Sequence, residues 1–226
     1  MQILFYDAHI IVCQKAAGEL SEGEGAAALP TLLASAMAEA GEQTAIFPVH
    51  RLDRETVGVM VFARTRQAAA ALSAALNTDA FAKEYLALCH GRLEEETATL
   101  TDLLFYDRRR GKSFVVDRPR AGVKKAVLDY TCLRTDGDFS LLRIALHTGR
   151  THQIRVQLAS RRHPLAGDRR YGAPKSEYSS VALAAYRLTF PHPAAGESMT
   201  FTAELPDWAA DYSGEHTPKT CTDEGV

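Results

Sequence analysis

The carboxylate of Asp53 lies among bases in residues 50–58, which read H-R-L-D-R-E-T-V-G, with Arg51 and Arg54 on either side. The apolar run over 57–62 follows directly. A short apolar run bounded by turn residues is typical of a buried strand, so Asp53 is expected where a loop meets a rigid sheet. Loops held by a scaffold often carry chemistry. A charged loop is also commonly solvated surface, and spacing alone leaves both interpretations open.

The same segment resembles the signature loop of the RluA-type pseudouridine synthases, H-R-L-D-x-x-T-S-G, with Val57 where serine is usual. Three further blocks resemble motifs of that family and follow in the same order. Residues 83–91 begin K-E-Y-L-A, residues 146–157 read L-H-T-G-R-T-H-Q-I-R-V-Q, and residues 163–172 begin H-P-L-A-G-D and end Y-G. The resemblance runs from about Ile3 to Trp208. It implies a chain that begins at the catalytic domain, without the N-terminal RNA-binding module of some relatives.

The activity implied by this resemblance is the conversion of uridine in RNA to pseudouridine. The reaction breaks the bond between N1 and C1′, turns the base and rejoins it through C5, so no cofactor is expected. One carboxylate can start it, by attack at C1′ or by removal of the C2′ proton. The resemblance gives this step to Asp53, and the sequence leaves both routes open.

The resemblance implies two further catalytic residues. A carboxylate that works at neutral pH in a pocket must stay ionised despite desolvation, which an adjacent cation achieves. Arg155, from the Q-I-R block, is expected to be that cation, although a helix arginine is otherwise more often a surface residue. Tyr85 is expected to stack on the uracil, although such a tyrosine is otherwise more often part of a core.

The target base is stacked in RNA, so it must be flipped out at a cost of roughly a few kcal/mol. By resemblance, Arg51 enters the vacated space, because a guanidinium plane can stack on bases and pair with phosphates. The alternative role of Arg51 is to pair with Asp53 or another acid.

The distribution of charge predicts a basic face. The net charge is −2, yet residues 106–125 hold eight basic residues against two acidic ones, and residues 143–175 hold eight against one. Charge separated in this way indicates a nucleic-acid surface or simply solvated loops. The residues expected to contact RNA are Arg51, Arg108, Arg109, Arg110, Lys124, Lys125, Arg150 and His152.

Length and composition indicate one globular domain. With 226 residues, of which 46 % are hydrophobic, the chain can bury one sizeable core. We expect a catalytic domain over 1–212 and a disordered tail over 213–226, which is polar and lacks periodicity. The sequence has no apolar run of about 18 residues and no basic-then-apolar N-terminus, so we expect a cytoplasmic protein that binds no membrane. We also expect a monomer, and the resemblance implies rRNA or tRNA as its partner and not DNA.

Cysteine and histidine spacing predicts neither disulfides nor a metal site. Cys13, Cys89, Cys132 and Cys221 lie far apart and are expected to be reduced. His147 and His152 are close in sequence, but no third ligand follows at a recognisable spacing.

Hydrophobic periodicity predicts an α+β domain with a mixed, mostly antiparallel sheet and three or four interspersed helices. The resemblance implies the pseudouridine synthase fold, with the catalytic cleft across the sheet. Strands are expected over 3–6, 10–13, 59–62, 81–89, 100–106, 113–116, 126–133, 139–147, 181–190 and 199–203. Helices are expected over 30–40, over 67–76, from a cap at Thr151 onward, and around Trp208.

Two other classes of protein stay open on the residues alone. A retaining glycoside hydrolase also uses a carboxylate at an anomeric carbon, but it needs a second acid about 5 Å away, for which the loop offers Glu55. A non-catalytic RNA-binding protein would need only the basic face, and Val57 at the usual serine position keeps that class open.

Overall fold

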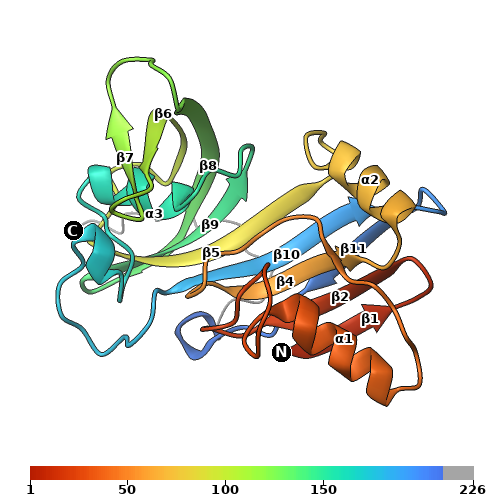
Figure 1. Ribbon diagram of the computed structural model, residues 1–226. Helices are drawn as coiled ribbons and strands as arrows, with labels where there is room; N and C mark the ends of the chain where they lie inside the picture. Colours follow the sequence, from red (N-terminus) through yellow and green to blue (C-terminus); the bar gives the residue numbers. More distant parts are fainter. Residues whose placement is uncertain (211–226) are drawn as a thin grey trace.

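The structure is a computed structural model, which describes residues 1–210. The expected tail over 213–226 and Cys221 lie outside the described residues. Within the described range the chain forms an 11-stranded sheet with three α-helices and two short 3-10 helices (Figure 1). The predicted α+β class is therefore confirmed.

The strands of the sheet are β1 (Gln2–Tyr6), β2 (Ile10–Lys15), β3 (Phe47–Pro48), β4 (Val57–Ala63), β5 (Ala82–His90), β6 (Thr97–Asp107), β7 (Lys112–Val116), β8 (Val123–Asp136), β9 (Phe139–Leu146), β10 (Leu183–Pro191) and β11 (Ser198–Thr202). Their order is β1-β2-β4-β10-β5-β9-β8-β6-β7, with β11 beside β10 and β3 beside β4. Among these pairs β4 and β10 run parallel, whereas the others are antiparallel. The sheet is mixed and mostly antiparallel, as predicted.

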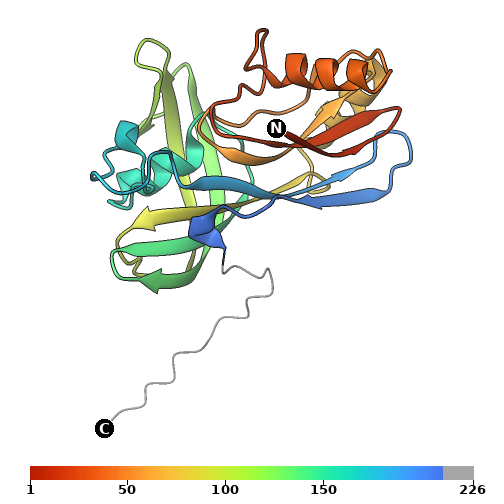
Figure 2. The same cartoon turned by 90° about the horizontal axis from the view of Figure 1, so that it is seen from below.

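The helices are α1 (Leu29–Glu39), α2 (Arg66–Ala75), α3 (Gln153–Ser160), η1 (Arg169–Tyr171) and η2 (Asp207–Ala209). α1 and α2 cover opposite faces of the sheet. Successive residues of a strand point to opposite faces, so the contacts of two neighbouring residues show which helix covers which face. Ile11 of β2 packs in the cluster that holds Leu33 of α1, whereas Val12 packs in the cluster that holds Leu72 of α2. Figure 2 shows α1 lying against one side of the sheet.

Both predicted helices of the N-terminal half are present, and the first has the proline expected at its start. The hydroxyl of Thr65 caps α2 by accepting a hydrogen bond from the backbone N–H of Ala68 at 3.1 Å. The strand β3 and the short helix η1 were not predicted from the sequence.

The start of α3 corrects one sequence prediction. Thr151 is not the cap, because the helix begins at Gln153 after His152, whose left-handed backbone has φ 55° and ψ 27°. The side-chain oxygen of Gln153 instead accepts hydrogen bonds from the Thr148 hydroxyl at 2.7 Å and from the backbone N–H of Arg150 at 3.1 Å. This bridge fixes the turn between β9 and α3.

The first residues of β4 pack closely against β10. Gly58 has a φ of 127°, and a Cβ at this position would lie 2.2 Å from the carbonyl oxygen of Ala185. Only glycine allows that approach. The loop that holds Asp53 is therefore anchored at its C-terminal end by the contact between β4 and β10.

Candidate active site

The loop of Asp53 is held from beneath by Lys15, the last residue of β2. The Lys15 ammonium is fully buried and donates hydrogen bonds to the carbonyl oxygens of Ala16 at 3.0 Å, Arg54 at 2.9 Å and Thr56 at 2.7 Å. Burial lowers the pKa of Lys15 to about 8, although the negative charges of Glu19 and Asp53 raise it in part. Two of the three carbonyls, those of Arg54 and Thr56, belong to residues that closely follow Asp53, so Lys15 fixes the backbone on the C-terminal side of the carboxylate.

The other end of the loop is held by Ser21. Its hydroxyl donates to the carbonyl of Leu52 at 2.8 Å and accepts from the Leu52 N–H at 2.9 Å. His50, one of the bases near Asp53 in sequence, accepts a hydrogen bond from the backbone N–H of Val61 at 3.1 Å. Burial lowers the pKa of His50 to about 3, so this side chain is a neutral part of the scaffold.

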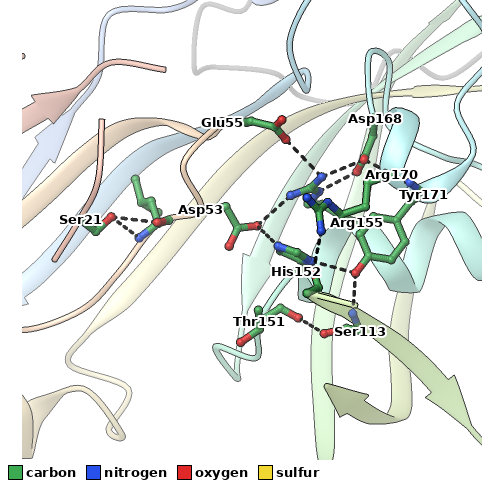
Figure 3. A network of polar contacts seen from close by, with 12 residues as sticks. Ser21, Asp53, Glu55, Ser113, Thr151, His152, Arg155, Asp168, Arg170 and Tyr171 are labelled. Carbon is green, nitrogen blue, oxygen red and sulfur yellow. Dashed lines mark hydrogen bonds and ion pairs between the residues drawn. The ribbon is translucent and has the colours of Figure 1, made fainter. Parts of the chain in front are cut away.

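Arg155 of α3 lies at the centre of three carboxylates (Figure 3). Its side chain is 3 % exposed and forms a bidentate pair with Asp168, at 2.7 Å from Nε and 2.8 Å from an Nη atom. Its outer atom Nη1 lies 3.4 Å from Oδ2 of Asp53, and Nη2, which also binds Asp168, lies 3.3 Å from Oε2 of Glu55. The structure thus brings Arg155 beside Asp53, as the sequence predicted, but Asp168 is its main partner.

The charge of Arg155 is fixed by these neighbours. Burial alone would lower the pKa of the guanidinium, but the hydrogen bonds and charge of Asp168, with Asp53 and Glu55, outweigh burial and raise it. The ring of Tyr171 lies 5.3 Å from the guanidinium carbon and adds a cation–π contact. Sequence reasoning missed Asp168, although it belongs to the block H-P-L-A-G-D and a carboxylate in such a block was the available signal.

One oxygen of the Asp53 carboxylate is held, and the other is available. Arg155 and His152 both approach Oδ2, at 3.4 Å and 3.8 Å. Figure 3 shows the second oxygen pointing away from both groups. The side chain of Asp53 is 19 % exposed, so a carboxylate oxygen can reach a bound molecule.

A cavity of about 680 Å³ opens in front of Asp53, and Arg51, Tyr85 and Arg155 also line it. Tyr85 of β5 is buried, and burial together with the charge of Asp53 raises the pKa of its hydroxyl, which stays protonated. Lys83, two residues earlier on the same strand face, also lines the cavity, and burial lowers its pKa. Sequence reasoning did not single out Lys83, although it begins the K-x-Y block.

Arg51 lies at the rim and pairs with an acid other than Asp53. Its guanidinium is 2.8 Å from Glu22, and the two side chains are 62 % and 56 % exposed. A surface ion pair of this kind contributes about 0–1 kcal/mol. Arg51 can therefore leave Glu22 at little cost.

A second cavity of about 630 Å³ lies beside the β6–β7 hairpin, and Arg108, Arg109 and Lys124 line it. Residues 149–151, which include Arg150, line both cavities and make them neighbours. Arg110 and Lys125 are not among the lining residues of either cavity. The Arg110 backbone N–H is bonded to Asp107 at 3.2 Å, and the Lys125 carbonyl accepts from Arg150 Nε at 3.0 Å.

Three observations concern other kinds of site. Within residues 1–210, no group of three or more His, Cys, Asp or Glu side chains is arranged to hold a metal ion. No helix in the same range is long and apolar enough to cross a membrane. Cys13, Cys89 and Cys132 are free thiols, and burial raises the pKa of Cys13 and Cys89 to about 12, which makes them poor nucleophiles.

Comparison with known proteins gives a consistent result. The sequence pattern of a family described as RNA pseudouridylate synthase matches residues 9–160. A Bacillus subtilis protein named uncharacterized RNA pseudouridine synthase YhcT is 33 % identical over 211 residues, which cover 91 % of this chain and 69 % of the relative. Ribosomal large subunit pseudouridine synthase D of Neisseria meningitidis is 35 % identical over 222 residues, covering 92 % of this chain and 59 % of the relative. The chain thus spans 59 % to 69 % of the length of these relatives.

The fold also matches a solved structure. The human protein RNA Pseudouridylate Synthase Domain Containing 4 superposes with a TM-score of 0.75 at 24 % identity, covering 92 % of this chain and 89 % of that one. At this identity the likeness establishes the shared fold.

Proposed function

The chain belongs to the RNA pseudouridylate synthase family, and from this premise we propose that it isomerises uridines of RNA to pseudouridine with Asp53 as the residue that starts the reaction. The observation that carries the proposal is the Asp53 carboxylate, held through Oδ2 by Arg155 while facing a cavity that Tyr85 also lines. An ionised carboxylate with a free oxygen is what either starting step requires.

The reaction balances within the substrate. The N1–C1′ bond breaks and the C5–C1′ bond forms, the C5 proton leaves and N1 gains a proton. Asp53 either bonds to C1′ and is released again, or removes the C2′ proton and returns it. Neither route transfers electrons or imports a group, so we propose that the reaction proceeds without a cofactor.

The remaining residues of the cavity have roles that follow from their chemistry. The Arg155 guanidinium holds the Asp53 carboxylate through Oδ2, at 3.4 Å, and leaves its second oxygen available to the substrate. The Tyr85 ring offers an apolar face for the uracil, and its hydroxyl stays protonated because burial and Asp53 raise its pKa. Arg51, released from Glu22, takes the place of the flipped base in the RNA stack.

The RNA is proposed to extend from the first cavity into the second. Arg108, Arg109 and Lys124 would meet phosphates there, because guanidinium and ammonium groups are the usual phosphate partners. A relative named for the large ribosomal subunit makes rRNA the first substrate to test and tRNA the second.

The proposal is tested with RNA that carries tritium at C5 of uridine. Isomerisation releases the tritium to water and leaves pseudouridine in the chain, whereas hydrolysis by a glycosidase releases free uracil. Asp53→Asn should bind RNA with parental affinity and release tritium at less than a thousandth of the parental rate. As a control, Asp102→Asn removes an ion-paired carboxylate of β6, 2.8 Å from Arg161, and should retain activity.

Three outcomes would overturn the proposal. Activity of Asp53→Asn within tenfold of the parent would remove Asp53 from the reaction. Free uracil without pseudouridine would show a hydrolase. Tight binding of rRNA and tRNA with no conversion of either would indicate a non-catalytic RNA-binding protein.

A further inference from the structure

His152 lies between the reacting carboxylate and a buried tyrosine (Figure 3). Its Nε2 is 3.8 Å from Oδ2 of Asp53, and its Nδ1 is 2.9 Å from the hydroxyl of Tyr171 in η1. The side chain of His152 is 13 % exposed, and the Tyr171 ring meets it edge to face at 5.6 Å. The imidazole is therefore enclosed, and each ring nitrogen faces a defined partner.

The hydrogen bonds around Tyr171 favour one tautomer of His152. The backbone N–H of Ser113 donates to the Tyr171 oxygen at 2.8 Å. Since an amide N–H can only donate, the Tyr171 oxygen is the acceptor in that bond, and Nδ1 of His152, 2.9 Å away, is an acceptor toward which the hydroxyl can direct its own proton. A neutral imidazole that accepts at Nδ1 carries its proton on Nε2. That proton points toward Oδ2 of Asp53.

We propose that Tyr171 and His152 form a positioning relay for Asp53, in which the Tyr171 hydroxyl holds His152 as its Nε2–H tautomer and this N–H shares Oδ2 of Asp53 with Arg155. The inference rests on the proposed function, because it takes Asp53 to be the reacting residue. Both relay residues act through Asp53 and not on the substrate. Their effect is to fix which carboxylate oxygen is held and which is free.

The charges around His152 favour the neutral ring that the relay requires. Burial has the largest effect and lowers the pKa of His152. The cations of Arg155 and Arg170 lower this pKa further, whereas the carboxylates of Asp53 and Asp168 raise it. Tyr106 of β6 packs against the ring edge to face at 6.4 Å and adds apolar surface. A neutral His152 can donate to Asp53 without removing the negative charge on which the carboxylate's reactivity depends. The separation of 3.8 Å is longer than a hydrogen bond, and catalytic contacts of this kind commonly tighten when substrate binds.

The relay also connects Asp53 to the hairpin that is proposed to contact RNA. Ser113 is the second residue of β7, and its hydroxyl donates to the Thr151 carbonyl at 2.5 Å, next to His152. Lys112 donates to the Arg170 carbonyl at 2.6 Å, and Arg170 donates to the Gly111 carbonyl at 2.7 Å. A shift of the hairpin on RNA binding would therefore be passed to η1 and to His152.

The tautomer can be measured without any substrate. In protein labelled with ¹⁵N at histidine, the ring nitrogen shifts of His152 should show the Nε2–H form at pH 7, with the signals assigned by their loss in His152→Asn. Asn suits this position because it tolerates a left-handed backbone. An Nδ1–H tautomer or an imidazolium at pH 7 would overturn the relay. This result does not depend on activity, so it judges the relay even if no RNA is converted.

Tyr171→Phe tests the kinetic effect, because the ring stays against Arg155 and only the hydroxyl is lost. We expect the single-turnover rate on saturating RNA to fall about tenfold, the upper range for one hydrogen bond, while RNA affinity stays within twofold. The acid limb of the pH–rate profile should move to higher pH, because His152 is no longer held as an Nδ1 acceptor. Tyr130→Phe is the matched control: this buried β8 tyrosine donates to the Glu95 carbonyl at 3.2 Å, and its loss should leave the rate within twofold.

A double-mutant cycle separates the relay from a purely structural role. His152→Asn should itself slow the single-turnover rate about tenfold or more. If Tyr171 acts through His152, then Tyr171→Phe in the His152→Asn background should cause no further loss of rate. Independent, multiplying losses would overturn the relay, as would a parental rate in His152→Asn or an unchanged pH–rate profile in Tyr171→Phe.

Discussion

The hydrogen bonds of Lys15 predict that a residue remote from the substrate controls both stability and catalysis. The change Lys15→Met keeps the length and apolar stem of the side chain but removes the ammonium. Three carbonyl oxygens, those of Ala16, Arg54 and Thr56, then lose the hydrogen bond from Lys15, although the Arg54 oxygen keeps one from the Gly18 N–H at 2.8 Å. Two of these belong to residues adjacent to or near Asp53 in sequence, so the loop is expected to relax where the carboxylate must stay fixed.

The magnitude follows from two opposing effects. A hydrogen bond from a charged donor contributes about 1.5–3 kcal/mol, and Lys15 makes three of them. Burial of the ammonium opposes these bonds, because lowering its pKa from 10.5 to about 8 corresponds to about 3 kcal/mol. With bonds near the middle of their range, the free energy of unfolding should fall by about 3 kcal/mol at pH 7.

The pH dependence of this difference has a defined sign. Lys15 has a lower pKa in the folded state, about 8, than the ordinary value of 10.5 that applies in the unfolded chain. Between these values the unfolded state binds more protons, so stability rises with pH through this group. Below pH 8 both states are protonated and the contribution is constant. The stability gap between parent and Lys15→Met should therefore widen from pH 8 toward pH 10.

Two assays check this reasoning. Urea unfolding at pH 7 and pH 10 gives the stability difference, and single-turnover tritium release on saturating RNA should be slowed more than tenfold with RNA affinity near parental. Lys175→Met, at an exposed lysine, is the control and should change stability by less than about 0.5 kcal/mol. A Lys15→Met protein with parental stability and rate would show that these bonds neither hold the loop nor position Asp53.

Three other changes address the remaining parts of the site. Asp168→Asn leaves Arg155 without its bidentate partner. We expect the free energy of unfolding in urea to fall by about 3 kcal/mol and the single-turnover rate to fall more than tenfold. A parental rate would show that Arg155 does not need Asp168 to hold it in place. Tyr85→Phe keeps the ring but loses the hydroxyl, so it should bind RNA normally and release tritium slowly, whereas full activity in Tyr85→Leu would remove Tyr85 from the site. Replacing Arg108, Arg109 and Arg110 with Ala should weaken RNA binding and flatten the slope of log K against log salt by about 1 to 2, measured at four salt concentrations; a parental slope would place the hairpin away from RNA.

Local sequence signals predicted most of the sheet because they act over short distances. The Asp-Gly signal at 136–137 lies at the turn between β8 and β9, and the strand predicted over 81–89 corresponds to β5, which carries Tyr85. The resemblance also brought Asp53, Tyr85 and Arg155 to one cavity. Each of these predictions needed only a pattern within about ten residues, or a family block that carries its own geometry.

The prediction failed where a distant contact overrides local preference. Threonine is a good helix-capping residue, but the Thr151 carbonyl accepts a hydrogen bond from the Ser113 hydroxyl of β7. The N-cap is instead His152, whose left-handed conformation few residues other than glycine adopt. Lys15 was assigned no role from the sequence either, since a lysine at a strand end is normally solvated and its three acceptors are backbone groups.

The unequal contacts of Arg155 explain how a buried cation can hold the Asp53 carboxylate in place and still leave it reactive. Asp168 holds the guanidinium tightly at 2.7 Å and 2.8 Å, whereas Asp53 is held at 3.4 Å. A carboxylate engaged in a bidentate pair has both oxygens occupied and its charge satisfied, which makes it a weak nucleophile and a weak base. Because Asp168 takes that position, the guanidinium is oriented from behind and offers Asp53 only one outer Nη atom. The structure therefore separates the acid that anchors the cation from the acid that is proposed to react, and the anchor is the fully buried one.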